Sequence, residues 1–101
     1  MNTVEINVTE ADIIKSIKNS QYSPIEYAVS RTLKENVDNV EVKTNSIIVW
    51  NNDDSDYYSY IYKDEYLEKV RIFLEEWQDF KDEIITEFCS EAFIFSAVRQ
   101  K

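Results

Sequence analysis

Glycine and histidine are absent from this chain, which contains one proline and one cysteine. Without glycine there is no P-loop and no dinucleotide-binding turn, because both motifs need backbone without a Cβ beside the phosphates. Without histidine, and with a single cysteine, the usual zinc sites and the Ser-His and Cys-His catalytic pairs are excluded as well. We therefore predict a protein that is not an enzyme and that binds neither a cofactor nor a metal ion.

Two features of the sequence indicate the cellular compartment of the protein: the single cysteine and the lack of long apolar runs. Cys89 cannot form an intrachain disulfide, which agrees with a reducing compartment, and its apolar neighbours predict a buried structural thiol. No run approaches the roughly 18 apolar residues of a membrane span, and the start MNTVEINVTEADI lacks the basic and apolar parts of a signal peptide. We expect a cytoplasmic protein without membrane contact.

Charge is the strongest bias of the chain, because acids outnumber bases by 20 to 11 and the formal net charge is −9. Residues 53–91 alone contain thirteen acids and four bases, an excess equal to that of the whole chain. Affinity for nucleic acids comes largely from Lys and Arg side chains that neutralise phosphates. The charge therefore argues against direct binding of nucleic acid.

The N-terminal part predicts a strand followed by a short helix. Residues 4–8 alternate apolar and polar side chains, as a strand with one buried face does. Thr9 follows as a helix N-cap, with Asp12 at the third helical position in a carboxylate variant of the capping box. The apolar stripe of this helix consists of Ile13, Ile14 and Ile17.

A second helix and a hairpin come next. Ser23 as N-cap and Pro24 at the first helical position predict a helix start, and we expect the helix to run to about Glu35. Residues 40–42 and 47–50 are strand-like, with a hairpin turn between them. The inward face of the helix is predicted to hold Ile25, Ala28, Val29 and Leu33.

The C-terminal half predicts a strand over residues 57–63, a long helix that starts at Asp64, and a closing strand over 92–97. Residues 84–88 are ambiguous, because they could also extend the helix. The resulting order β-α-α-β-β-β-α-β is an α+β class fold, a small, mostly antiparallel sheet with helices packed on it, in one domain over residues 1–101. The apolar stripe of the long helix consists of Tyr66, Val70, Phe73, Trp77 and Phe80.

The order of these motifs resembles that of a loose family of small tailed-phage accessory proteins of unassigned function. The stretches that carry the resemblance are VEINVTEADI, SPIEYAVSRTL, VRIFLEEWQDF and EAFIF. Two positions depart from the family pattern: Ser23 stands where the family often has cysteine, and Ala92 lacks a preceding proline. The resemblance implies a phage or prophage accessory gene. By its size, acidity and lack of cofactor motifs, the chain also resembles phage anti-defence inhibitors such as anti-CRISPR proteins.

Two kinds of carboxylate chemistry can be weighed. Asp54, Asp56 and Glu65 occupy positions 1, 3 and 12 of a calcium-binding loop, but Tyr58 and Ser59 stand at positions 5 and 6, where the loop needs a ligand and a glycine. Paired acids also hydrolyse glycosides or hold Mg²⁺, and the long helix offers Glu75/Asp79 and Asp79/Asp82. A solvated helix face explains these pairs better.

Three tyrosines of the 57–63 strand share one side of it, because side chains alternate along a strand. Two orientations remain open for Tyr58, Tyr60 and Tyr62. Inward, they pack in the core with their hydroxyls at its edge. Outward, they form the aromatic centre of an interface with an acidic rim.

We predict that the chain binds a basic site on a host nucleic-acid-handling defence complex and inhibits it by imitating a row of phosphates. The alternatives are an oligomeric module that binds a nucleotide signal through Tyr58, Tyr60, Arg31 and Arg71, and a phage accessory subunit. A homodimer is compatible with each of these. The predicted partner-binding residues are Asp53, Asp54, Asp56, Tyr58, Tyr60, Tyr62, Glu65, Glu68, Glu75, Glu76, Asp79 and Asp82.

Overall fold

A computed structural model describes residues 3–50 and 56–100. The elements, in chain order, are strand β1 (Thr3–Val8), helices α1 (Glu10–Lys18) and α2 (Pro24–Leu33), the 3-10 helix η1 (Val37–Asn39), strands β2 (Val40–Val42), β3 (Ser46–Trp50) and β4 (Tyr57–Tyr62), helix α3 (Asp64–Lys81) and strand β5 (Phe93–Arg99). The predicted α+β class and the predicted order of elements are confirmed.

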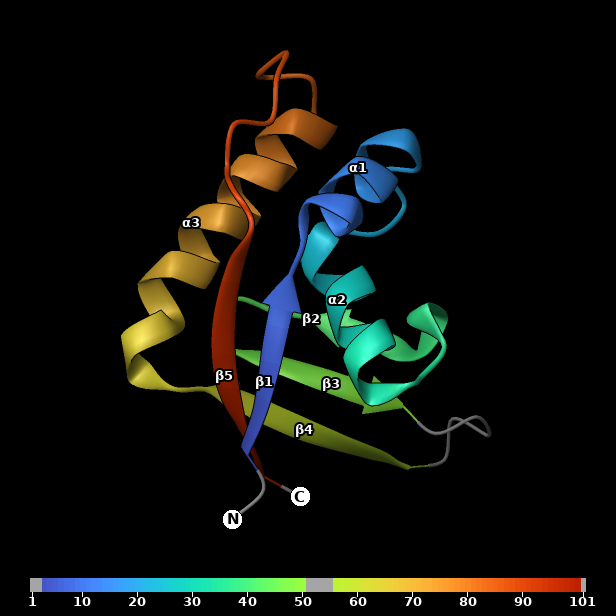
Figure 1. The fold of residues 1–101 in the computed structure, drawn as a ribbon, viewed down its shortest axis with the longest axis vertical. Coiled ribbons are helices and arrows are strands. Elements are labelled where there is room, and N and C mark those ends of the chain that lie inside the picture. The colour runs from blue at the N-terminus through green and yellow to red at the C-terminus, as the bar shows by residue number, and fades with distance from the viewer. Residues whose placement is uncertain (1–2, 51–55, 101) are drawn as a thin grey trace.

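The sheet has five strands in the order β1-β5-β4-β3-β2, and every neighbouring pair is antiparallel. Strand β5 lies between the first strand and the β2-β3-β4 meander. It pairs with all of β1, from Val8 opposite Phe93 to Thr3 opposite Val98. It pairs with β4 over only three positions, so the sheet curls there and β1 and β5 run steeply across the meander (Figure 1).

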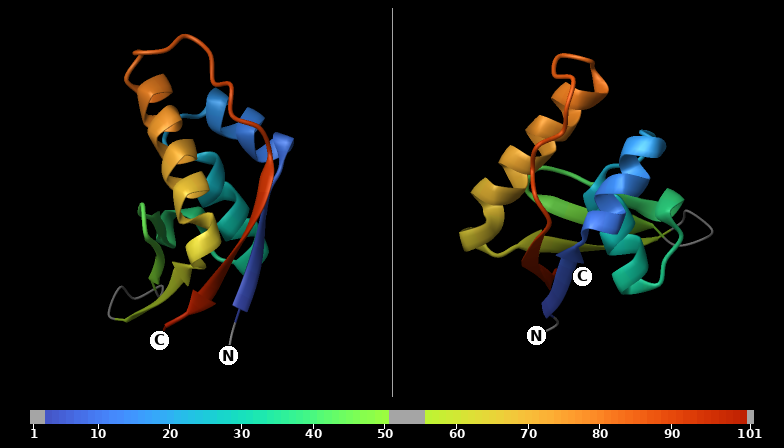
Figure 2. Two further views of the ribbon diagram at one scale, coloured as in Figure 1. Left: turned by 90° about the vertical axis from the view of Figure 1, so that its left-hand side faces the viewer. Right: turned by 45° about the horizontal axis from the view of Figure 1, so that its top comes forward.

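One face of the curled sheet forms the core together with the helices. Figures 1 and 2 place α3 on one side of β1 and β5, and α1 and α2 on the other. Because side chains alternate along a strand, every second residue points inward and reaches the helices. The buried inward residues of the strands are Ile6, Val8, Val40, Ile47, Val49, Tyr60, Tyr62, Phe95 and Ala97, and those of α2 and α3 are Ile25, Ala28, Val29, Val70, Phe73 and Trp77.

Helix α1 starts as predicted but packs through a different face. The Thr9 hydroxyl accepts a hydrogen bond from the Asp12 backbone N–H (3.2 Å), and the Asp12 carboxylate accepts one from the Thr9 N–H (2.9 Å), which completes the capping box. The predicted apolar stripe is wrong, because Ile14 and Ile17 are 47% and 43% exposed. Asp12, Ile13 and Ser16 point inward instead. A serine fits there because its hydroxyl donates to the Ile13 carbonyl of its own helix (2.8 Å), leaving no unsatisfied donor.

Helix α2 has a second capping box, formed by Ser23 and Glu26, and ends at Leu33 rather than near Glu35. It ends because Lys34 adopts a left-handed conformation, with φ 58°. Glycine usually takes this position at a helix C-terminus. In a chain without glycine, a lysine takes the left-handed conformation at the end of α2 and Glu83 does so after α3, with φ 62°.

The segment after α3 is neither helix nor strand, so the ambiguous residues 84–88 do not extend the helix. The closing strand is present but begins at Phe93 and ends at Arg99, later than predicted. Phe88 returns from this segment to pack edge-on against Phe73, with ring centroids 5.2 Å apart. Of residues 51–56, which connect β3 to β4, the structure describes only Asp56, which is exposed.

Tyr62 connects the strand pair β4-β3 to the turn before β3. Its ring is 1% exposed, and its hydroxyl donates to the backbone carbonyls of Lys43 (2.7 Å) and Ser46 (3.2 Å). Burial is the main cause that raises the pKa of this hydroxyl. We expect Tyr62→Phe to lower the free energy of unfolding by about 1 kcal/mol, because the hydrogen bonds from this buried hydroxyl to the turn are lost. Urea denaturation measures the change.

The matched control is Tyr66→Phe, at a half-buried tyrosine whose hydroxyl has no hydrogen-bond partner in the described part of the chain. This substitution should change the stability by less than about 0.5 kcal/mol. Equal effects of the two substitutions would show that the Tyr62 hydroxyl does not hold the turn.

Candidate functional site

Helix α3 carries the largest group of predicted partner-binding residues. Val70, Phe73 and Trp77 bury one side of this 18-residue helix, which is about 27 Å long. The opposite side and the C-cap carry carboxylates, most of them exposed. We call this set the α3 acidic face: Glu65, Glu68, Glu75, Glu76, Asp79 and Asp82.

An arginine lies within the α3 acidic face. The Arg71 guanidinium donates to Glu75 Oε2 at 2.6 Å and to Glu68 Oε1 on the preceding turn. All three side chains are about half exposed or more. Ion pairs at this exposure contribute roughly 0.2–1 kcal/mol each, so a cation from a partner competes readily with Arg71 for these carboxylates. The face is therefore acidic, with Arg71 as an internal countercharge and Lys69 at its border.

Glu76 has a structural role besides its charge. Its carboxylate accepts hydrogen bonds from the Cys89 backbone N–H (3.2 Å) and from the Ser90 hydroxyl. These bonds hold the segment after α3 against the helix. The prediction of a buried Cys89 is wrong: the cysteine is exposed, because its neighbour Phe88 is the side chain that turns toward the core.

Ile72 is a surface residue that the sequence reasoning missed. Its side chain is 51% exposed, although it is apolar. On a helix, residues three and four apart are neighbours, so Ile72 lies next to Glu68, Glu75 and Glu76 and also next to Lys69. The signal was present in the sequence, because an isoleucine at this position is out of phase with the buried stripe of α3. An exposed apolar side chain surrounded by charges has the composition of an interface centre and rim.

Tyr60 and Tyr62 of β4 point into the core, which removes them from the partner surface. Tyr60 and Tyr62 are 7% and 1% exposed. Tyr60 lies opposite Ile47 in the sheet, on the inward side of β3. The prediction that they bind a partner is wrong, because alternation along β4 places them on the same side as the aliphatic core of the neighbouring strand.

Tyr58 lies on the same side of β4 but at the rim of the core, half-buried. Its hydroxyl donates to Glu35 Oε2 at 2.9 Å, and the Arg99 guanidinium lies 4.5 Å from the ring centre. Burial, followed by the hydrogen bond to Glu35, raises the pKa of Tyr58 to about 12. Tyr58 therefore joins the end of α2 to β4 and β5.

The remaining predicted site residues are those around the β3-β4 connection. Asp53 and Asp54 lie outside the described residues. Asp56 is exposed at the start of β4, and its carboxylate accepts a hydrogen bond from the Tyr57 backbone N–H (2.8 Å). It lies beside β4 and not on α3, so the structure does not join it to the α3 acidic face by any described contact.

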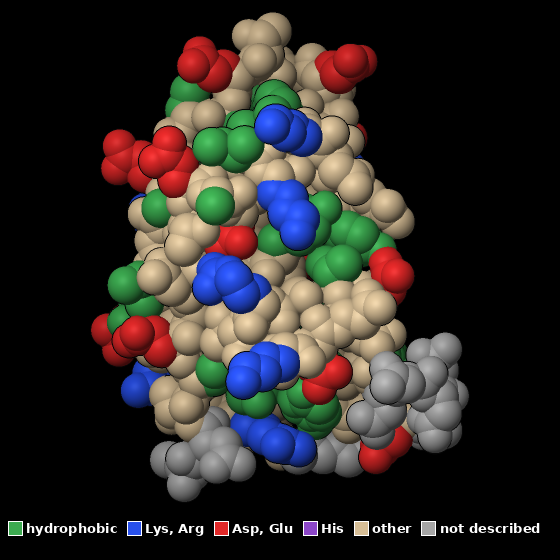
Figure 3. All heavy atoms as spheres, turned by 45° about the vertical axis from the view of Figure 1, so that its right-hand side comes forward, with side chains coloured by type: hydrophobic (Ala, Val, Ile, Leu, Met, Phe, Trp, Pro, Cys, Tyr) green, Lys and Arg blue, Asp and Glu red, His purple; other side chains and the backbone are tan. Residues whose placement is uncertain are grey.

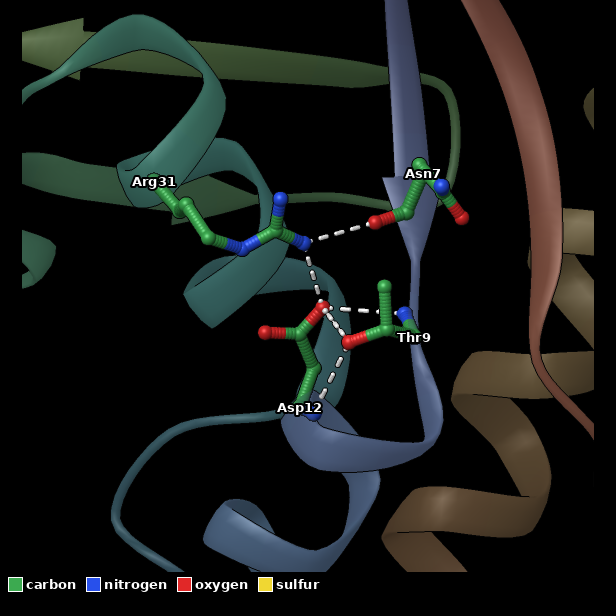
Figure 4. Close-up of polar contacts among 4 residues, drawn as sticks. All are labelled: Asn7, Thr9, Asp12 and Arg31. Carbon is green, nitrogen blue, oxygen red and sulfur yellow. Dashed lines mark hydrogen bonds and ion pairs between the residues drawn. The ribbon is translucent and has the colours of Figure 1, made fainter.

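A second charged cluster links β1, α1 and α2 (Figure 4). The buried carboxylate of Asp12 accepts hydrogen bonds from the hydroxyl and N–H of Thr9 and from Arg31 Nη2, the last at 2.7 Å. The same nitrogen of Arg31 donates to the Asn7 carbonyl (2.8 Å) at the edge of the sheet. This cluster is explained by structure, because Arg31 joins α2 to α1 and to β1, and the Thr9 contacts cap α1.

The nucleotide-binding alternative needs Arg31 and Arg71 near Tyr58 and Tyr60. Arg31 is bound to Asp12 beside β1, and Arg71 is bound to glutamates of α3, while Tyr60 is buried. The four side chains therefore do not form one pocket. Figure 3 shows Lys and Arg side chains in a line down one face of the molecule. Helices α1 and α2 carry Lys15, Lys18 and Arg31, and Lys34 caps α2.

A cleft of about 340 Å³ opens between the start of α2, the β2-β3 turn and α3. Its lining includes Glu26, Lys43, Trp77 and Lys81. Burial raises the pKa of Glu26 above its usual value, although hydrogen bonds from Ser23 act in the opposite direction. The cleft therefore holds a carboxylate that is costly to ionise.

Within residues 3–50 and 56–100, no group of three or more His, Cys, Asp or Glu side chains is arranged to hold a metal ion. No helix in the same part of the chain is both long and apolar enough to cross a membrane. The partial match to a calcium-binding loop begins at Asp54, outside the described residues.

Comparisons with protein-family models, with curated proteins and with solved structures find no match for this chain. The fold defines it as a small α+β protein with a five-stranded antiparallel sheet. Its function must therefore be argued from the surfaces described above.

The raised pKa of Glu26 predicts a pH-dependent stability. A folded-state pKa above the ordinary 4.5 means that the folded chain favours the protonated acid. The stabilisation from this group is present below pH 4.5 and is lost as the pH rises through the folded-state pKa. We expect Glu26→Gln to be more stable than the natural chain at pH 7, because glutamine keeps an acceptor for the Ser23 N–H (2.8 Å) without the charge.

Thermal unfolding at pH 4 and pH 7 measures this effect, and the gain should disappear at the lower pH. The control is Glu65→Gln on the exposed side of α3, which should change the stability by less than about 0.5 kcal/mol. A loss of stability for Glu26→Gln at pH 7 would contradict the argument from burial.

Proposed function

We propose that this chain is a phage inhibitor that binds a basic nucleic-acid-binding surface on a host defence complex through the α3 acidic face. The observation that carries the proposal is the exposed Ile72 among the carboxylates of that face. A purely solubilising surface needs charge but no apolar side chain at its centre. An interface uses both, the apolar centre for affinity and the charges for steering.

The spacing of the carboxylates supports competition with nucleic acid. Residues three or four apart on a helix are separated by about 5 Å along its axis, and one DNA strand carries a charge every 3.4 Å. The row on α3 is therefore sparser than a phosphate backbone and includes Arg71. We infer that the α3 acidic face imitates part of a phosphate row and that Ile72 supplies the affinity that the missing charges do not.

The first test is a titration of the purified chain against purified host complexes that bind DNA or RNA, at about 50 and 200 mM salt. We expect the affinity to fall as the salt concentration rises and a DNA duplex to displace the chain from its partner. Affinity that is independent of salt, or a ternary complex with the duplex, would contradict mimicry. Binding only to a phage protein would instead support an accessory subunit.

The second test reverses charge on either side of Ile72. Glu65→Lys combined with Glu75→Lys should lower the affinity roughly tenfold or more, because like charges would then face the basic partner. The control, Glu5→Lys combined with Asp38→Lys, changes the net charge equally but lies on β1 and η1. Equal losses in the two double variants would show that only net charge matters.

The third test separates the apolar contribution from the charge. Ile72→Ala should raise the dissociation constant about tenfold while leaving its salt dependence unchanged, since it removes apolar contact area without changing charge. Ile84→Ala is the control, because Ile84 is 70% exposed but lies after the end of α3. Unchanged binding of the Ile72 variant would remove this residue from the interface.

A further inference from the structure

The cleft of about 340 Å³ between the start of α2, the β2-β3 turn and α3 has apolar walls and charges of both signs. Its apolar lining consists of Val42 of β2 and of Leu74 and Trp77 of α3. Ligand pockets in proteins span about 300–1,000 Å³ and combine an apolar lining with a few polar groups that orient the ligand. The cleft lies at the small end of this range, so it fits a ligand the size of an amino acid better than a nucleotide.

Glu26 provides a negative charge in the cleft and has one carboxylate oxygen without a hydrogen bond. Its Oε1 accepts a hydrogen bond from the Ser23 N–H (2.8 Å), while Oε2 accepts none from the described part of the chain. Within residues 3–50 and 56–100, every buried side-chain nitrogen and oxygen has a partner, so Oε2 of Glu26 is open to solvent. Burial is the main cause that raises the pKa of Glu26, so a cation placed beside Oε2 would stabilise the ionised carboxylate.

Lys81, the last residue of α3, provides a positive charge in the same cleft. It lies near enough to Glu26 to act against the rise of the pKa of that carboxyl. None of the ion pairs in the described part of the chain joins Lys81 to Glu26, however. Opposite charges that share a cleft without touching leave room for a ligand that carries both charges.

Two further charged residues line the cleft, and both have partners within the chain. The ammonium of Lys43 lies 3.6 Å from the carboxylate of Glu41. The carboxylate of Glu75 accepts a hydrogen bond from Arg71 at 2.6 Å. The charges that remain for a ligand are therefore one carboxylate on α2 and one ammonium on α3.

We propose that this cleft binds a free α-amino acid with an apolar side chain, with its ammonium at Glu26 and its carboxylate at Lys81. The side chain of the amino acid lies against Leu74 and Trp77. A zwitterion has no net charge, so the net charge of −9 does not repel it. A simple anion would be repelled by Glu26, and an amine without a carboxylate would be repelled by Lys81. Neither charged residue belongs to the α3 acidic face, so this site does not depend on the proposed partner.

The first test titrates the full chain with leucine, methionine and phenylalanine and follows the NMR signals of its N–H groups. We expect a dissociation constant of about 0.1–1 mM, because a small ligand in an open cleft makes few contacts. The indole signal of Trp77 should shift, while that of Trp50, which lies on β3 outside the cleft, should not. The N-acetyl derivative lacks the ammonium and the amide derivative lacks the carboxylate, so each should bind roughly tenfold more weakly.

Two results of this titration would overturn the proposal. The first is that none of the three amino acids shifts the Trp77 signal at concentrations up to about 10 mM. The second is that the N-acetyl or the amide derivative binds as tightly as the free amino acid, since one of the two charges would then have no role.

The second test removes one charge of the cleft at a time. Glu26→Gln and Lys81→Gln should each raise the dissociation constant roughly tenfold, because one charge of the amino acid then lacks its partner. Loss of folding does not explain the effect, since Glu26→Gln is expected to be more stable than the natural chain at pH 7. The controls Glu5→Gln on β1 and Lys18→Gln on α1 remove the same charges from exposed positions outside the cleft and should leave binding unchanged. Binding that is unaffected by Glu26→Gln or by Lys81→Gln, or that weakens equally in the controls, would contradict the proposed site.

Discussion

The pairing of β5 with both β1 and β4 is the constraint on which the rest of the structure depends. The two ends of the chain meet in this pairing, because β1 has no other strand beside it and β5 closes the sheet. Contacts between residues so far apart in sequence cost loop-closure entropy before they stabilise the fold. The curl arises at the same place, since β5 and β4 share only three paired positions. The curled sheet encloses the core residues of α2 and α3.

The curl also separates the surfaces of the molecule. The α3 acidic face lies on the helix side, and Tyr57 and Ile61 of β4 are exposed on the other side of the meander. The line of Lys and Arg side chains in Figure 3 is a third surface. Arg31 of α2 is held by the buried Asp12. A chain with a net charge of −9 therefore has an uneven charge distribution, which allows different partners to bind to different sides.

Several parts of the fold could be predicted from the residues because they depend on local chemistry. The capping box at Thr9 and the N-cap at Ser23 are confirmed, since a side-chain oxygen three residues from a free N–H readily forms a local hydrogen bond. The inward side of α3 was predictable because a long helix with one apolar stripe must bury that stripe. The inward side of the short α1 was not predictable, because Ile13, Ile14 and Ile17 allow two different inward faces. The contact of α1 with α2 selected the face that contains Ser16.

The sequence by itself determined the order of the elements, the excess of acids over residues 53–91 and the lack of glycine and histidine, which are local or additive properties. Only the tertiary structure decided which side of β4 is buried, because both sides of that strand are apolar and the choice depends on its neighbours β3 and β5. The same choice placed Tyr60 and Tyr62 in the core and left Tyr57 and Ile61 exposed. The tertiary structure also decided that Arg71 pairs with Glu68 and Glu75 and that Glu76 holds the segment after α3. The sequence could not decide this, because charges on one helix face have several geometrically allowed partners.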